Sequence, residues 1–315
     1  MYIWCPDFIP ILALVLAPRF SRYFALFLSR FLKTYYLCVR FSDNETRESM
    51  KIAIIGAGNM GGAVARGLAQ GSRIATSDIY VSNPSTAKLE ALKSEFPEIN
   101  ITTDNCVAAA AADIVVLAVK PWKVEEVISE IKPNLDYSHQ AVASVVGGLG
   151  VAQLSEWLDK GDGLLPATYL IMPNTAIATM SSMTFIVSER STAEQDNCLI
   201  EVFDELGKAM LIEESVMPAA TSLASCGIAY ALRYIRAAME GGVELGLRAD
   251  DAKNIVMQTL RGAVDVLAAN NSHPEAEIDR VTTPGGLTIK GLNAMEAAGF
   301  SHSVIEGLRA STKRE

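Results

Sequence analysis

The hydrophobic pattern from Met50 onward alternates between two periods. Short β-branched runs predict strands at 51–56 (KIAIIG), 79–82 (IYVS), 99–102 (INIT), 113–119 (DIVVLAV) and 141–146 (AVASVV). Apolar positions at helical spacing predict helices at 59–71, 86–95, 104–111 and 122–131, the first closed by Gly71. Right-handed crossovers place such helices on both faces of a parallel sheet, so the pattern predicts an α/β fold.

The remainder of the chain divides at about residue 213. Three more short strands are predicted at 168–172 (TYLIM), 183–187 (MTFIV) and 208–212 (KAMLI). After Glu214 the strand pattern stops, and alanine- and leucine-rich stretches with helical spacing continue to the end. We therefore predict an N-terminal Rossmann-type doubly wound sheet at 50–213, followed by an all-helical domain at 214–315.

The first 49 residues have a different composition. The apolar run at 8–18 is shorter than the roughly 20 residues that a bilayer span needs, and no basic region precedes it. Residues 19–40 contain five basic and no acidic side chains, interleaved with aromatics, which could also indicate a membrane-surface or transit segment. Because Met50 directly precedes the first predicted strand, we expect residues 1–49 to be an extension from a misassigned start, or disordered.

Composition limits the classes of partner. Of the 315 residues, 50% are hydrophobic and 20% charged, enough for one large or two ordinary cores. A net charge of −9 without a Lys/Arg stripe disfavours nucleic acid, and we expect no membrane partner. Five scattered cysteines without a Cys-x-x-Cys pair, and three isolated histidines, favour a cytoplasmic protein without a metal site.

The strongest local motif is GAGNMG at 56–61, which has the Gly-x-Gly-x-x-Gly spacing. The glycines permit a tight turn, close approach of a pyrophosphate and close packing of helix on strand. A lone match could be only a tight turn, but this one follows a strand and opens a helix. The candidate cofactor-binding residues here are Gly56, Ala57, Gly58, Asn59 and Met60.

Two further strand ends bear on the cofactor. The second strand ends in VSNPSTAK at 81–88, without the carboxylate that an NAD site usually offers to the ribose. Ser82 and Asn83 can donate to a 2′-phosphate and Lys88 can add charge, so NADPH is favoured, with NADH still possible. Alternatively, this stretch is a polar loop in which Ser85 caps the next helix. The fourth strand ends at the ligand-binding edge, and its candidates are Ala118, Val119, Lys120 and Pro121.

Five motifs together resemble the pyrroline-5-carboxylate reductase family. They are GAGNMGGAVARGL, LAVKP, MPNT at 172–175, GGVELGL at 241–247 and TTPGGLTIKGL, and the resemblance covers residues 50 to about 310. It implies a Rossmann domain, a helical dimerisation and substrate domain, and reduction of the cyclic imine 1-pyrroline-5-carboxylate to L-proline by NAD(P)H, the last step of proline biosynthesis. It also implies a homodimer, with a decamer of dimers as an open alternative. Asn174 is, by the same resemblance, a cofactor or substrate contact.

The turn VTTPGGLTIKGL at 281–292 is, by this resemblance, the substrate-binding segment. Thr288 is then the catalytic candidate, as hydrogen-bond or proton donor to the ring nitrogen. A partly protonated imine needs no strong acid, and free amides at a helix start suit a carboxylate. The substrate-binding candidates are Thr282, Thr283, Gly285, Gly286 and Leu287. Without the other motifs, a Pro-Gly turn with threonine capping would explain the segment as well.

One segment departs from the family pattern. Where the family has Ser-Gly-Ser-Gly-Pro-Ala-Tyr, this chain has ASCGIAY at 224–230, with Ile228 in place of proline. Two alternatives to the reductase therefore stay open. A 3-hydroxy-acid dehydrogenase of related architecture would need a catalytic lysine at the start of the helical domain, and residues 216–227 contain none. A non-catalytic NADPH-binding regulator would explain the altered segment as lost catalysis.

Overall fold

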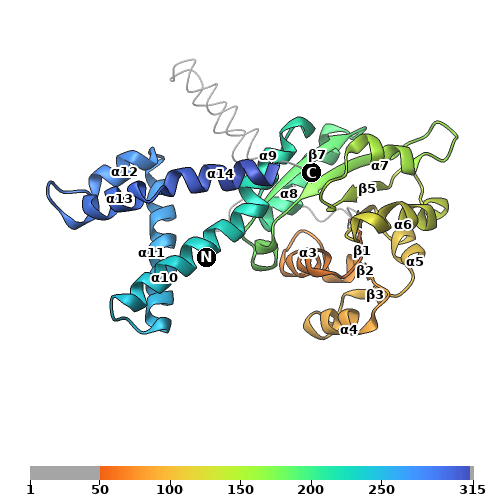
Figure 1. Cartoon of the computed structure of the whole chain (residues 1–315). Helices are drawn as coiled ribbons and strands as arrows, with labels where there is room; N and C mark the ends of the chain where they lie inside the picture. Colours follow the sequence, from red (N-terminus) through yellow and green to blue (C-terminus); the bar gives the residue numbers. More distant parts are fainter. Residues whose placement is uncertain (1–49, 313–315) are drawn as a thin grey trace, which may run out of the picture. The chain divides into compact units, whose positions relative to one another are not determined.

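The computed structural model describes residues 50–312. The expectation for residues 1–49 lies outside the described residues. The described chain begins with an α/β half and ends with a helical half, as Figure 1 shows by colour along the sequence. This order confirms the predicted fold class.

The α/β half is built on one eight-stranded sheet in the order β3-β2-β1-β4-β5-β6-β7-β8. The strands β1 to β6 pair in parallel, as predicted. The pair of β6 and β7 is antiparallel, however, because the nine residues between them are too few for a helical crossover, and β8 then runs parallel to β7. The strands are β1 (Ile52–Ile55), β2 (Ile79–Ser82), β3 (Asn100–Thr102), β4 (Ile114–Leu117), β5 (Ala141–Ser144), β6 (Ala167–Met172), β7 (Ser182–Glu189) and β8 (Gly207–Leu211).

Helices cover both faces of this sheet, which explains why the central strands β1 and β4 are apolar throughout. In β1, Ile52 and Ile54 pack on one face, whereas Ala53 and Ile55 pack on the other. The first face is covered by α3 (Asn59–Gln70), α4 (Thr86–Glu95) and α8 (Ala193–Glu205). The second face is covered by α5 (Asn105–Ala110), α6 (Val124–Ile131) and α7 (Val151–Leu158).

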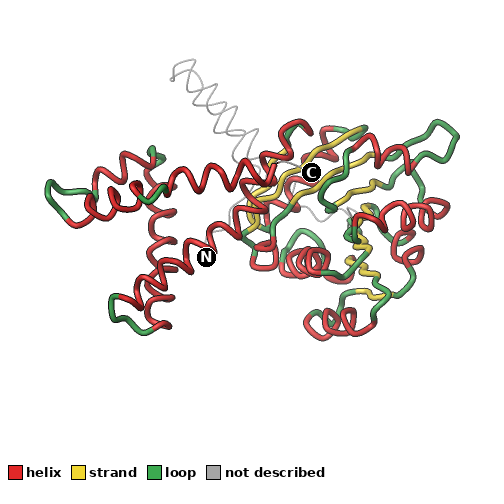
Figure 2. The backbone as a smooth tube through the Cα atoms, in the orientation of Figure 1, coloured by secondary structure: helices red, strands yellow, loops and turns green. Residues whose placement is uncertain are grey.

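The helical half starts after β8 and contains no strand among its described residues (Figure 2). It opens with a short 3₁₀ turn, η7 (Glu214–Val216), and one long helical stretch, in which a π-helical segment interrupts the α-helix. The last helix, α14, returns to this stretch, since the Ser222 hydroxyl donates to the Leu308 carbonyl at 2.8 Å. The elements are α9 (Met217–Ala220), η8 (Thr221–Cys226), α10 (Gly227–Glu244), α11 (Ala249–Asn270), α12 (Pro274–Arg280), α13 (Leu287–Ala297) and α14 (Phe300–Thr312).

Few side chains of the helical half are buried within one protomer. From residue 217 to 312 the buried ones are Met217, Ser222 and Ala252. By length and composition alone, the stretch Glu214–Glu244 is apolar enough to cross a membrane, and only 11% of its most apolar window is buried. This half therefore presents apolar surface that its own chain leaves uncovered.

Candidate active site

Glycine occupies each fixed position of the Gly-x-Gly-x-x-Gly loop for a different steric reason. Gly56 has φ +110°, and a Cβ there would lie 2.7 Å from the Ala118 carbonyl oxygen. A Cβ on Gly61 would lie 1.9 Å from the Gly56 carbonyl oxygen, so only glycine allows α3 to pack this closely on the loop. Around Gly58, in contrast, nothing lies within 4 Å of the position of a Cβ. The loop therefore leaves its backbone open at Gly58, where a ligand can approach it.

The start of α3 offers free amides at the same place. Gly58 is the N-cap residue and provides no side-chain cap, so the amides of Asn59 and Met60 have no acceptor earlier in the helix. The Ala57 amide is used differently, because it donates to Oδ1 of Asn83 at 3.0 Å. Of the predicted loop contacts, Gly58, Asn59 and Met60 are thus the ones whose amides can face an anion.

The side chains of Ser82 and Asn83 make hydrogen bonds within the α/β half. Both are buried, and the Ser82 hydroxyl donates to Oδ1 of Asn105 at 2.8 Å. Asn83 accepts the Ala57 amide and donates through Nδ2 to the Ser85 carbonyl at 3.1 Å. Ser85 is the N-cap residue of α4, although its hydroxyl makes no capping bond. The contact of Asn83 with Ala57 holds the loop in shape, and a direct contact of Ser82 or Asn83 with a 2′-phosphate stays a prediction.

A cavity of about 440 Å³ lies over the first turns of α3, beside the glycine loop. Lys88 of α4 and Arg66 of α3 line it together with Gly58, Gly62 and Thr175. Arg66 is held by Glu95 through two contacts of 2.7 Å, and this hydrogen bonding raises the pKa of its guanidinium above the ordinary value. Lys88 is exposed and belongs to no ion pair within the described part of the chain. Two positive side chains therefore flank the open glycine backbone.

Arg66 was not predicted from the sequence, although a signal for it was present. Gly58, Gly62 and Arg66 are spaced four residues apart, which places them on one face of α3. Because the two glycines carry no side chain on that face, the long side chain of Arg66 can border the cavity. The spacing of four residues from Gly58 and Gly62 was thus a signal for Arg66 in the sequence.

The predicted residues at the end of β4 lie beside this loop. The Ala118 amide donates to the Ile55 carbonyl at 2.9 Å, so the ladder between β1 and β4 continues to this point. Ala118 and Val119 are half-buried, while Lys120 and Pro121 are exposed. The strand order reverses between β1 and β4, and in open α/β sheets ligands bind in the crevice at such a switch point.

Asn174 follows β6, whose carboxyl end lies at the same edge of the sheet as the carboxyl ends of β1 and β4. Its side chain is 5% exposed and accepts the Ala176 amide at 3.0 Å, capping the short 3₁₀ helix η6 (Thr175–Thr179). Its Nδ2 donates to the Ala224 carbonyl of the helical half at 3.5 Å. The side chain is thus used within the protein, and its contact with cofactor or substrate stays a prediction.

The turn between α12 and α13 is hydrogen-bonded at its beginning and exposed at its end. The Thr282 hydroxyl donates to the Ile278 carbonyl at 2.7 Å, and the Gly286 amide donates to the Thr283 carbonyl at 2.9 Å. Gly285 has φ +71°, which favours glycine. Gly286 is the N-cap residue of α13 without a side-chain cap, and Leu287 and Thr288 are exposed. The turn therefore presents amides and a threonine hydroxyl outward, while Thr282 serves α12.

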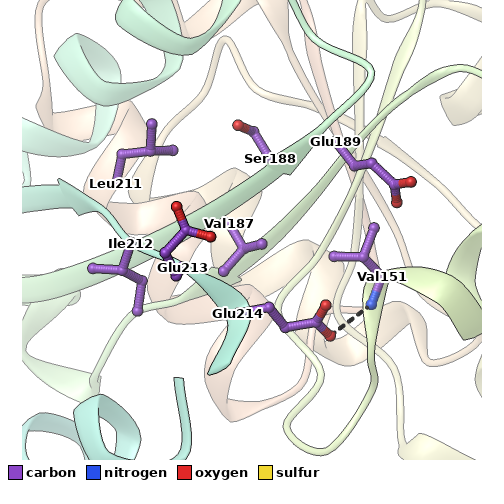
Figure 3. Close-up of a pocket in the computed structure, with 8 residues that line it drawn as sticks. All are labelled: Val151, Val187, Ser188, Glu189, Leu211, Ile212, Glu213 and Glu214. Atoms are coloured by element: carbon purple, nitrogen blue, oxygen red, sulfur yellow. Dashed lines mark hydrogen bonds between the residues drawn. The ribbon is translucent and has the colours of Figure 1, made fainter. Parts of the chain in front are cut away.

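A second cavity, of about 420 Å³, is acidic and lies apart from these residues. Figure 3 shows Glu189, Glu213 and Glu214 around it, with Glu214 accepting the Val151 amide at 3.0 Å. Glu189 is paired with Arg190 at 2.7 Å. Carboxylates of this density oppose an anionic cofactor or substrate, so the cavity beside the glycine loop is the better candidate site.

Comparison with known proteins agrees with this geometry. Residues 214–315 match the family described as pyrroline-5-carboxylate reductase dimerisation, and residues 51–148 match NADP oxidoreductase, coenzyme F420-dependent. Pyrroline-5-carboxylate reductase 2 of Dictyostelium discoideum is 37% identical over 86% of this chain and 93% of its own length. The chain belongs to the pyrroline-5-carboxylate reductase family.

Two other relatives extend this assignment. Pyrroline-5-carboxylate reductase 1 of the same organism is also 37% identical, over 84% of this chain, but the match spans 49% of that longer protein. The crystal structure of the Plasmodium falciparum reductase with NADP bound has a TM-score of 0.75 at 27% identity, covering 85% of this chain and 97% of that one. Membership of the reductase family also argues against the 3-hydroxy-acid dehydrogenase alternative.

In this reductase-family chain, one protomer does not bring the whole candidate site together. Figure 1 places α12 and α13, which flank the predicted substrate turn, at the end of the helical half away from α3 and β1. The glycine loop, the end of β4 and Asn174 do share one edge of the sheet. The predicted site residues thus form two groups in the single chain, one for the cofactor and one for the substrate.

Proposed function

We propose that this protein reduces 1-pyrroline-5-carboxylate to L-proline with NADPH, as the last step of proline biosynthesis. The observation that carries the proposal is the uncapped start of α3 at the switch point of the sheet, where Gly58 leaves the backbone open. The proposal assigns dinucleotide binding to residues 50–213, and dimerisation and substrate binding to residues 214–315.

On this proposal the cofactor lies across the edge formed by β1 and β4. The amides of Gly58, Asn59 and Met60 would hold its pyrophosphate, and Ala118 to Pro121 would border its nicotinamide half. Lys88 would bind the 2′-phosphate, and the proposal therefore includes a preference for NADPH over NADH. When bound, the nicotinamide supplies the hydride that reduces the imine carbon.

The preference for NADPH has a direct test. Lys88→Ala should weaken NADPH binding about tenfold and leave NADH binding unchanged, because only NADPH carries the 2′-phosphate. The measurement is titration of cofactor fluorescence, with Lys123→Ala as the control, since Lys123 is paired with Glu126 away from the cavity. Equal losses for both cofactors would contradict this role of Lys88.

The substrate would bind at the turn between α12 and α13. The amides of Gly285 and Leu287, with Thr283, suit its carboxylate, while the Gly286 amide closes the turn on the Thr283 carbonyl. The Thr288 hydroxyl would donate to the ring nitrogen. The C=N double bond becomes a single bond as hydride joins the carbon, and the nitrogen keeps or takes a proton. Since the imine is basic enough to arrive partly protonated, a hydroxyl that orients it is sufficient.

A second copy of the chain would complete the site. The proposed cofactor edge, formed by the glycine loop at 56–61 and the end of β4, is separated in one protomer from the proposed substrate turn at 281–288. Residues 214–315 match a dimerisation domain. We infer that each site combines the cofactor edge of one protomer with the turn of its partner. The proposal further includes assembly into larger oligomers, a cytoplasmic location supported by the unbridged thiols of Cys106 and Cys226, and no membrane or nucleic-acid partner.

Turnover by the purified full chain tests the proposed reaction. NADPH oxidation should depend on added pyrroline-5-carboxylate, and proline should appear in equal amount. A protein that binds NADPH without forming proline would instead be the non-catalytic regulator.

A further inference from the structure

The long helix that opens the helical half contains a π-helical turn. α9, η8 and α10 follow one another without a break, and η8 covers Thr221–Cys226. A π turn contains one extra residue, is rare, and occurs frequently at functional sites. Here it coincides with the segment where the chain departs from the family pattern, including Ser225 at a position where that pattern has glycine.

The π turn changes which side chains share a face of the helix. In a regular α-helix, two residues that are eight positions apart differ by about 80° around the helix axis. One inserted residue between them reduces this angle to about 20°. Ser222 and Tyr230 are such a pair. The Ser222 hydroxyl donates to the Leu308 carbonyl at 2.8 Å, and the Tyr230 hydroxyl donates to the Gly307 carbonyl at 3.1 Å. The extra residue thus lets one helix hold two neighbouring carbonyls of α14.

The same turn holds the α/β half through different groups. The Ser225 hydroxyl donates to the Pro173 carbonyl at 3.3 Å. Beside it, the Ala224 carbonyl accepts Nδ2 of Asn174 at 3.5 Å. Pro173 and Asn174 are both buried, directly after β6. The loop at 173–175 is therefore fixed from the helical half by two polar contacts.

This loop is packed against the cofactor edge on its other side. Thr175 lines the same cavity as Gly58. A Cβ on Gly67 of α3 would lie 2.8 Å from the Ile177 carbonyl oxygen, so η6 packs directly on the backbone of α3. A shift of the loop away from the π turn would consequently move a wall of the cofactor cavity.

We propose that Ser225 is a positioning residue, whose hydroxyl fixes the loop at 173–175 beside the cofactor edge. It acts through Pro173 and Asn174, so the dimer-forming half sets the geometry in which hydride is transferred. This inference rests on the proposed reduction of the imine. It also gives the altered segment at 224–230 a role in catalysis.

Three variants of the full chain test this role. Ser225→Ala should lower kcat about fivefold, the effect of one net hydrogen bond, while the KM for the imine and the Kd for NADPH stay within about twofold. The amides of residues 174–179 should exchange with deuterium about fivefold faster. Ser225→Thr keeps the hydroxyl and should restore both values. Ser222→Ala, in the same π turn but facing α14, should lower thermal stability and leave kcat unchanged.

Two results would overturn the inference. One is a Ser225→Ala enzyme with unchanged kcat and exchange, and the other is an equal loss of kcat in Ser222→Ala. If the unsubstituted chain forms no proline, the proposed function fails, and exchange alone decides the positioning role. Faster exchange at 174–179 in Ser225→Ala but not in Ser222→Ala then supports it, and equal exchange contradicts it.

Discussion

The two halves of this protein have similarly apolar sequences but bury their apolar side chains differently. In the α/β half, both faces of the sheet are covered, and large side chains such as Tyr169 and Phe203 are almost fully buried. In the helical half, Leu232, Val264 and Leu287 are 59%, 66% and 85% exposed in one protomer. The first half finds its core within its own chain, whereas the second needs another copy. An exposed apolar side chain therefore indicates an interface with another copy in the helical half, but not in the α/β half.

The largest effect is expected from a charge on the apolar surface of the helical half. Leu232→Asp should weaken self-association about a thousandfold, because a symmetric interface would bury the unpaired carboxylate twice. Val107→Asp is the matched control, since Val107 is 56% exposed in the α/β half, close to the 59% of Leu232. Analytical ultracentrifugation measures both. A dimer that tolerates Leu232→Asp would remove this surface from the interface.

The next effect tests whether the two halves of one site come from different protomers. Thr288→Ala alone should lower kcat about a hundredfold with NADPH affinity unchanged, and Gly58→Asp alone should prevent NADPH binding by like charge. Co-expressed, the two variants should recover about one quarter of the normal activity, because half of the dimers are mixed and each holds one intact site. Failure to recover activity would place both groups in the same protomer, and full activity of Thr288→Ala would exclude that residue.

Sequence reasoning succeeded where the structure is determined locally. Every strand of the sheet was predicted within about two residues, and β1 and β4 were the clearest because buried parallel strands are continuous apolar runs. The glycine loop was equally readable, because its steric reasons lie within six residues. The reversal at β7 was missed, although the short connection from Met172 to Ser182 contained the signal.

The parts that the sequence could not predict depend on distant residues. The contact of Ser82 and Asn83 with a phosphate stays a prediction, but the hydrogen bonds of their side chains to Asn105 and Ala57, which lie 23 and 26 residues away, were not foreseen. The separation of Thr288 from the cofactor edge depends on the course of α10 to α13, which no local pattern specifies. The π turn likewise has no signature in hydrophobic spacing. Local chemistry was thus more predictable than the assembly of the site.

A smaller effect distinguishes an open glycine from a packed one. Gly58→Ala should weaken NADPH binding about tenfold and change the free energy of unfolding by about 0.5 kcal/mol or less, since its Cβ meets nothing within 4 Å. Gly61→Ala should instead cost about 2 kcal/mol of stability, because its Cβ would clash with the Gly56 carbonyl. Urea unfolding and fluorescence titration separate the two. The reverse pattern would show that Gly58 is a structural position.

The smallest effect concerns acid stability in the helical half. Hydrogen bonds from Ser272, Asn270 and Arg280 to the Glu277 carboxylate hold its pKa below the ordinary value of 4.5. A carboxylate with a lowered folded pKa contributes stability above pH 4.5, and this contribution is lost as the pH falls through the folded value. Glu277→Gln should therefore lower the melting temperature at pH 7 by about 2 °C or less, and the difference should shrink below pH 4. Glu275→Gln, on the same turn of α12, is the control and should match the unsubstituted chain at both pH values. A Glu277→Gln difference that is constant with pH would mean that the hydrogen-bond geometry, rather than the charge, holds the segment before the predicted substrate turn.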